Sequence, residues 1–99
     1  MSRSIMQQKN GCCYLCEKLG QRQQGYIIEE HHCLGGPNRK RSEHYGLKVY
    51  LCIRHHREGP EAVHNNSDYM NMLREDAQRA FEERYPNQSF LEIFGRNYI

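Results

Sequence analysis

Four cysteine and histidine residues stand in two pairs whose spacing is typical of structural zinc ligands. Cys13-x2-Cys16 forms the first pair, and Cys52-x2-His55 lies far downstream. Each two-residue spacer turns both side chains toward one point, and a tetrahedral zinc ion would join the two points in a Cys3His site. Cys12 remains an alternative to Cys13, because Cys12-x3-Cys16 is also workable.

Four further histidines form a second group. His31 and His32 end one predicted strand, whereas His56 and His64 follow another. Antiparallel pairing of the two strands would bring the first pair close to the second. Zinc would use His55, so the other four imidazoles would be left near one another. Neutral imidazoles suit a catalytic divalent metal ion, and the sequence therefore predicts a second, catalytic centre.

Two predicted strands must position these side chains, at residues 26–33 and 47–53. The first begins with Tyr-Ile-Ile and ends before the turn-forming sequence Gly-Gly-Pro-Asn. The second alternates as a half-buried strand does. The residues that share its apolar face are Leu47, Val49, Leu51 and Ile53. Between the strands, the segment 37–46 is predicted to be a polar, basic loop.

The two histidines of the first strand raise a geometric question. Adjacent residues on a regular strand point to opposite faces of the sheet. His31 and His32 can therefore serve one site only if the strand bulges or ends there. Gly35 and Gly36 favour such an ending.

Helices are predicted for the C-terminal third. From Ser67 onward, apolar residues share one helical stripe. The stripe consists of Tyr69, Met70, Leu73, Ala77, Ala80 and Phe81. Ser67 or Asn66 can cap its start, and Pro86 ends it. The sequence Ser-Phe-Leu-Glu at 89–92 is a capping-box pattern that opens a last short helix, with Gly95 as its stop.

The chain of 99 residues suits a single domain, 1–99, of the α+β class. Its hydrophobic fraction of 37%, with no Trp, indicates a thin core that a metal ion would reinforce. Residues 1–10 are polar and are predicted to be frayed or weakly helical.

The cysteines also bear on the compartment. No apolar stretch follows Met1 as in a signal peptide, and no run approaches the length of a membrane span. The cysteine count is odd, and Cys33 is left over as a small apolar side chain at a strand end. We therefore expect reduced thiols, as in a cytoplasm.

Basic residues gather in the middle of the chain, although the net charge is only +2. One cluster is Arg39, Lys40 and Arg41, and Arg54 and Arg57 flank the second His pair. A basic middle fits a surface that faces phosphates. We expect these five residues to contact phosphates, with a solvated basic loop as the alternative, and such contacts give affinity without reading sequence.

The ordered motifs resemble those of a known family. Cys-x2-Cys, then Glu-His-His followed by Gly-Gly, then Leu-Cys-x2-His-His is similar to the HNH nucleases, above all small phage-type members with double His pairs. The resemblance covers residues 12–64, and the set is specific although each motif alone is weak. It implies a zinc-stapled ββα-metal hairpin (treble-clef-like) at 12–64, followed by C-terminal helices at 67–99.

The resemblance also assigns roles to the histidines. His31 and His56 would bind the catalytic ion, Mg²⁺ or Mn²⁺, although such a site would also take Ni²⁺, Co²⁺ or Zn²⁺. His32 would be the general base that activates water, and His64 is a candidate third ligand. A one-residue shift of register would instead make Glu30 the ligand and His31 the base.

The sequence departs from the family pattern at the middle Asn. The residues before the second Cys pair, His-Tyr-Gly-Leu-Lys at 44–48, contain no Asn. Asn38 lies earlier, and its role and that of His44 are left open. Because that Asn often orients the base or the hairpin, the means by which His32 is held is also open.

The expected function is metal-dependent hydrolysis of phosphodiester bonds in DNA, as a nickase or a double-strand endonuclease and as a monomer or homodimer. One alternative is a non-catalytic zinc-stapled DNA-binding module, in which the four remaining histidines are accidental. Another is a phage assembly or recombination accessory protein, with the apolar helix stripe as its interface.

Overall fold

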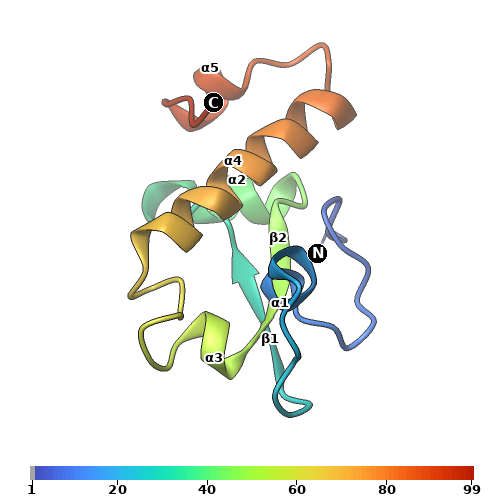
Figure 1. Ribbon diagram of the computed structural model, residues 1–99. Coiled ribbons are helices and arrows are strands. Elements are labelled where there is room, and N and C mark those ends of the chain that lie inside the picture. The colour runs from blue at the N-terminus through green and yellow to red at the C-terminus, as the bar shows by residue number, and fades with distance from the viewer. Residues whose placement is uncertain (1) are drawn as a thin grey trace.

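The computed structural model describes residues 2–99 as an antiparallel hairpin surrounded by helices (Figure 1). The two strands are β1 (Ile28–His32) and β2 (Lys48–Cys52). The helices are α1 (Tyr14–Leu19), α2 (Arg39–His44), α3 (Ile53–His56), α4 (Ser67–Arg84) and α5 (Phe90–Phe94). The predicted α+β class is confirmed.

The strands lie where the sequence predicts them, but β2 is more buried than expected. In the register of the hairpin, Ile28 pairs with Cys52 and His32 pairs with Lys48. All five residues of β2 are buried, so the predicted half-buried strand is wrong. The alternation of apolar and polar residues misleads because Lys48 and Tyr50 are covered as well.

The N-terminal segment supplies part of this cover. The prediction of a frayed or weakly helical segment is wrong for its described part, which runs along the outer edge of β2. The backbone N–H of Ile5 donates to the Gly46 carbonyl at 2.9 Å, and the Tyr50 N–H donates to Gln7 Oε1 at 2.8 Å. The segment thus occupies a strand edge whose backbone groups would otherwise be exposed.

The segment 37–46 is also not the loop that its polarity predicts. A 3₁₀ turn at Gly36–Asn38 leads directly into α2. Ser42 is the one buried residue of α2, and its hydroxyl donates to the Leu47 carbonyl and accepts from the Leu34 N–H. The helix was missed because a polar side chain, not an apolar stripe, attaches it to the hairpin.

The C-terminal helices follow the prediction closely. Asn66 caps α4 by accepting from the Tyr69 N–H at 3.0 Å. Ser89 caps α5, and Gly95 ends it in the left-handed conformation. Figure 1 shows α4 crossing the hairpin obliquely, with α5 beyond it.

The apolar stripe of α4 faces the core of the chain itself. Leu73, Ala77 and Phe81 are fully buried. The Phe81 ring packs against Tyr45 and Phe90, with centroids 5.2 and 5.5 Å apart. These residues of the stripe therefore pack in the hydrophobic core of this chain. Within residues 2–99, no helix combines the length and the apolar character that crossing a membrane requires.

Candidate metal centres

The first candidate centre consists of Cys13, Cys16, Cys52 and His55, all of them buried. Cys13 caps the start of α1, and Cys16 lies in its first turn. Cys52 ends β2, and His55 follows on α3. The structure places Cys13 in the cluster, whereas Cys12 stays outside it.

The distances within this cluster fit a tetrahedral ion. The Sγ atoms of Cys13 and Cys16 each lie 3.4 Å from His55 Nδ1, and that of Cys52 lies 3.6 Å from it. The Sγ atoms of Cys16 and Cys52 are 3.8 Å apart. A tetrahedron with zinc bond lengths has edges of roughly 3.8 Å between sulfurs and roughly 3.6 Å between sulfur and nitrogen. The cluster could therefore bind a metal ion such as zinc.

Burial and a neighbouring arginine act in opposite directions on the pKa of the Cys16 thiol. Burial raises the pKa of the Cys16 thiol to about 12, so a bare thiol there would stay protonated. Arg54 donates to Cys16 Sγ at 3.4 Å and to the Arg22 carbonyl at 3.2 Å. The structure thus places Arg54, which the sequence assigned to DNA phosphates, against the thiol cluster.

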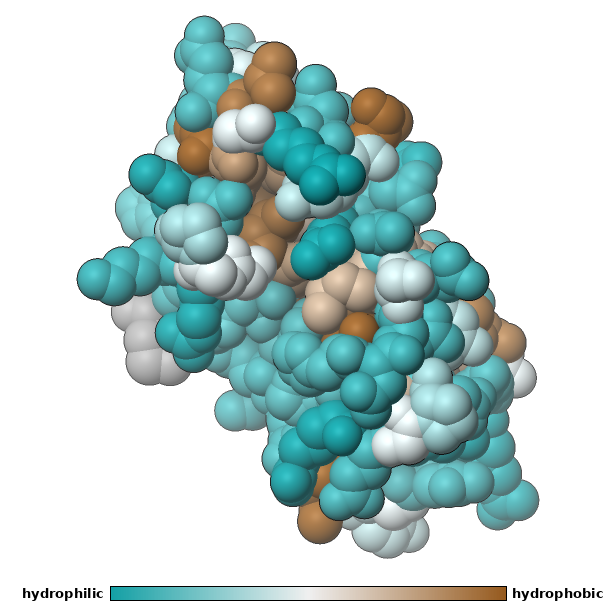
Figure 2. Space-filling view, turned by 90° about the vertical axis from the view of Figure 1, so that its left-hand side faces the viewer, coloured by the Kyte–Doolittle hydropathy of each residue, from teal (hydrophilic) through white to brown (hydrophobic). Residues whose placement is uncertain are grey.

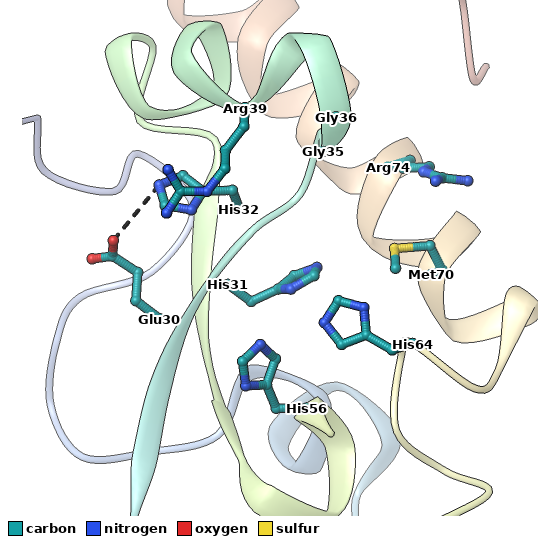
Figure 3. A pocket seen from close by; sticks show the side chains of 10 residues that line it. All are labelled: Glu30, His31, His32, Gly35, Gly36, Arg39, His56, His64, Met70 and Arg74. Carbon is teal, nitrogen blue, oxygen red and sulfur yellow. Dashed lines mark ion pairs between the residues drawn. The ribbon is translucent and has the colours of Figure 1, made fainter. Parts of the chain in front are cut away.

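The second candidate centre is formed by His31, His56 and His64. Their ring centroids are 5.3 to 5.4 Å apart, and the three imidazoles point toward one another (Figure 3). His31 comes from β1 and His56 from α3. His64 follows Val63, which is buried and whose N–H donates to the His55 carbonyl at 2.7 Å. These three are the residues that the sequence assigns to the catalytic ion.

The nitrogens of this trio are suited to accept a cation. His31 Nε2 is buried and has no hydrogen-bond partner. Burial, followed by the charges of His56 and its neighbours, lowers the pKa of His31 to about 3 and keeps the ring neutral. His56 Nδ1 donates to Glu29 Oε1 at 2.8 Å, which leaves the lone pair on Nε2. Metal-binding histidines commonly carry such a carboxylate partner.

His32 lies on the other side of the strand. Because neighbouring residues of β1 alternate, its ring turns away from the trio and toward Glu43, whose Oε1 is 2.8 Å from His32 Nε2. Yet His31 and His32 both line one pocket of about 470 Å³, which Gly35 and Gly36 also line just after the end of β1. The strand does not need to bulge.

A third group, Glu30, His32 and Glu43, is close enough together to suggest a metal site. The ammonium of Lys48 already lies between its carboxylates, 3.3 Å from Glu30 Oε2 and 3.0 Å from Glu43 Oε1. The hydrogen bonds from His32 and Lys48 lower the pKa of Glu43 to about 2. Lys48 therefore takes the place that a cation would need.

The predicted basic residues are distributed among several environments. Arg39 lines the histidine pocket, and Lys40 and Arg41 line a separate depression beside His44. Arg57 donates to Glu29 Oε1 at 2.9 Å. Figure 2 shows that hydrophilic side chains cover most of one face, with hydrophobic ones in small separate patches.

Sequence reasoning missed several residues around the pocket. Arg74 and Met70 line it from α4, and Glu29 and Glu43 hold its histidines. The helix itself is predicted, but the angle at which it docks is not, so no pattern pointed to Arg74. Asn38 faces elsewhere, and its side-chain amide donates to the Phe94 carbonyl at 3.0 Å.

Comparisons of this chain with protein-family models, with curated proteins and with solved structures found no match.

Proposed function

We propose that this protein is a metal-dependent DNA endonuclease of the HNH type, built on a zinc-stapled ββα-metal hairpin. The observation that carries the proposal is the convergence of His31, His56 and His64 in one pocket that His32 also lines. The ordered motifs along the chain agree with it. The buried Cys3His cluster would hold the structural zinc beside this pocket.

The electrostatics of the pocket favour an anionic substrate. Arg39 lines it from α2 and Arg74 from α4, and Glu30 is the one acidic side chain among the described residues that line it. Lys48 pairs with both Glu30 and Glu43 and therefore offsets only part of the Glu30 charge, but the two arginines still outnumber this carboxylate. A phosphodiester would meet a site with net positive charge, which raises the local concentration of anions.

Different side chains of the pocket would carry out different steps of the hydrolysis. The two arginines would position the phosphate, and His32 would take the proton from the attacking water. A divalent cation held by the trio would supply Lewis-acid stabilisation of charge at the scissile phosphate. The structure supports the register with His31 as ligand and His32 as base, because Glu30 faces Lys48 instead of the trio.

A plasmid-nicking assay tests the proposal. Purified protein is incubated with supercoiled plasmid and Mg²⁺, Mn²⁺, Ni²⁺ or EDTA, and His32→Ala is compared with the wild type. His44→Ala is the matched control, because His44 is exposed and lies outside the histidine pocket. We expect metal-dependent nicking that falls by roughly 10²–10⁴-fold in His32→Ala and persists in the control.

Two outcomes would contradict the proposal. Equal nicking by the wild type and His32→Ala would assign the activity to another residue or to a contaminant. Absence of nicking with every metal, together with retained DNA binding, would favour the non-catalytic zinc-stapled binding module.

A further inference from the structure

The carboxylate of Glu43 joins three segments of the chain that are distant in sequence. Its Oε1 lies 2.8 Å from His32 Nε2 on β1 and 3.0 Å from Lys48 Nζ on β2. Its Oε2 accepts from Lys48 Nζ and from the backbone N–H of Ser2, each at 3.1 Å. Glu43 itself is on α2, the helix that replaces the expected loop.

Lys48 fixes the position of this carboxylate. Its side chain is 2% exposed, so its ammonium must be paired, and it bridges Glu43 and Glu30. Lys48 is also the cross-strand partner of His32 in the hairpin. The register of the two strands therefore sets the distance between the ammonium, the carboxylate and the imidazole.

We infer that Glu43 is the positioning residue of the nuclease, holding the His32 imidazole with its proton on Nε2 and its lone pair on Nδ1. The inference rests on the proposed function. The carboxylate accepts the Nε2–H bond, and the remaining ring nitrogen is then the one that can receive a proton from water. Glu43 is half-buried, and a carboxylate that accepts from a catalytic imidazole fixes the ring's tautomer in the same physical way in acid–base triads.

The same contacts argue against other roles for Glu43. It is not among the residues that line the histidine pocket, whereas His32 is, so it would act through the imidazole and not on the substrate. A metal-ligand role is disfavoured because Lys48 occupies the space beside both carboxylates. The sequence pattern has no Asn at the position that often orients the base, and Glu43 would hold His32 in its place.

Glu43→Gln tests the inference with two readouts. In this variant Lys48 would donate to the side-chain amide oxygen, so the amide NH2 would face His32 Nε2. An NH2 donor at that position favours the imidazole tautomer with its proton on Nδ1. We expect kcat for plasmid nicking to fall by roughly 10²–10⁴-fold with KM unchanged. We also expect ¹⁵N NMR of the zinc-loaded protein, without the second metal, to show Nε2–H in the wild type and Nδ1–H in the variant.

Glu83→Gln is the matched control, because Glu83 is exposed on α4 and should alter neither readout. If Glu43→Gln does not fold, Glu43→Asp replaces it. The shorter carboxylate should lower kcat at unchanged KM and weaken the preference for Nε2–H.

The outcomes separate this inference from the nuclease itself. If the wild type cuts DNA but His32 carries its proton on Nδ1, or if a folded Glu43 variant keeps wild-type kcat, the role of Glu43 is overturned and the nuclease stands. If the wild type does not cut with any metal, the nuclease is overturned and the role of Glu43 with it. The tautomer of the wild type needs no variant, so a folding defect cannot hide the answer.

Discussion

His55 and His56 are neighbours on α3, yet their imidazoles enter different clusters. His55 Nδ1 lies 3.4 Å from the sulfurs of Cys13 and Cys16, while the His56 ring lies 5.4 Å, centroid to centroid, from that of His31. One short helix therefore carries a ligand of each candidate centre. Any movement of α3 caused by loss of the first cluster must also displace the second.

Loss of the Cys3His cluster is therefore expected to disrupt the histidine trio as well. Structural zinc supplies on the order of 10–16 kcal/mol of apparent binding energy in small domains. We expect Cys16→Ser to lower the melting temperature sharply in circular dichroism and to release zinc. Cys12→Ser is the control, since Cys12 lies outside the cluster. Equal stability of the two variants would contradict a metal staple at this cluster.

The carboxylate of Glu29 is predicted to tune metal binding at the trio. It accepts from His56 Nδ1 at 2.8 Å and so holds the ring with Nε2 toward the pocket. Loss of such a partner typically weakens metal binding 10–100-fold, so we expect about this effect for Glu29→Gln. Titration calorimetry of the zinc-loaded protein with Ni²⁺ measures it. The exposed Glu58→Gln should bind as the wild type does, and equal affinity of both variants would remove the role of Glu29.

The candidate ligand residues are predictable from sequence because short-range geometry places them. Two-residue spacers aim Cys13 and Cys16 at one point, and the antiparallel pairing of β1 and β2 brings His31 to His56. Caps and stops such as Ser89 and Gly95 are equally local signals. These parts depend on neighbours along the chain or on one strand pairing.

The parts that sequence reasoning missed depend on tertiary contacts. β2 is buried throughout because the N-terminal segment and Glu43 cover the residues that alternate with its apolar ones. Glu43 and Arg74 reach the site only through the docking angles of α2 and α4, which no periodicity encodes. Polar side chains such as Ser42 carry packing that a hydrophobic pattern does not reveal.

Gly46, against which the N-terminal segment packs, is predicted to tolerate alanine less well than Gly59. Its φ is +73°, and a Cβ there would collide with the Arg3 carbonyl oxygen. Gly59 has a similar φ of +86° but open space around it. Gly59→Ala should therefore cost roughly 1–2 kcal/mol of backbone strain, and Gly46→Ala clearly more. Chemical unfolding measures both, and equal losses would show that the N-terminal segment does not constrain this position.

His31 is predicted to stay neutral across the physiological pH range. Burial lowers its pKa to about 3, well below the usual value of a histidine, so protonation is disfavoured in the folded state. In the unfolded chain this histidine binds a proton near pH 6.5. It therefore lowers the free energy of unfolding as the pH falls from about 6.5 toward 3. In NMR titrations of the zinc-loaded protein, its ring signals should not shift between pH 8 and about 5.5. A midpoint near the usual value would indicate an exposed ring.

Arg74 is predicted to bind the phosphate of the substrate. Arg74 lines the pocket from α4, and its guanidinium is hydrogen-bonded to Asn71 and lies 5.5 Å from the centroid of the Tyr98 ring. Replacing it with Met keeps much of the length and removes the charge. KM for DNA should rise, and the salt dependence of binding should lose about one phosphate contact.

The control for Arg74→Met is Arg96→Met. Arg96 lies over the same Tyr98 ring, at 5.1 Å, but lines a different depression. A defect shared equally by both variants would show that the tyrosine packing matters and the charge at the pocket does not. A defect confined to Arg74→Met would show that α4 supplies a phosphate contact in addition to closing the core. Helix α4 would then contribute to substrate binding through Arg74 as well as to the core through Leu73 and Phe81.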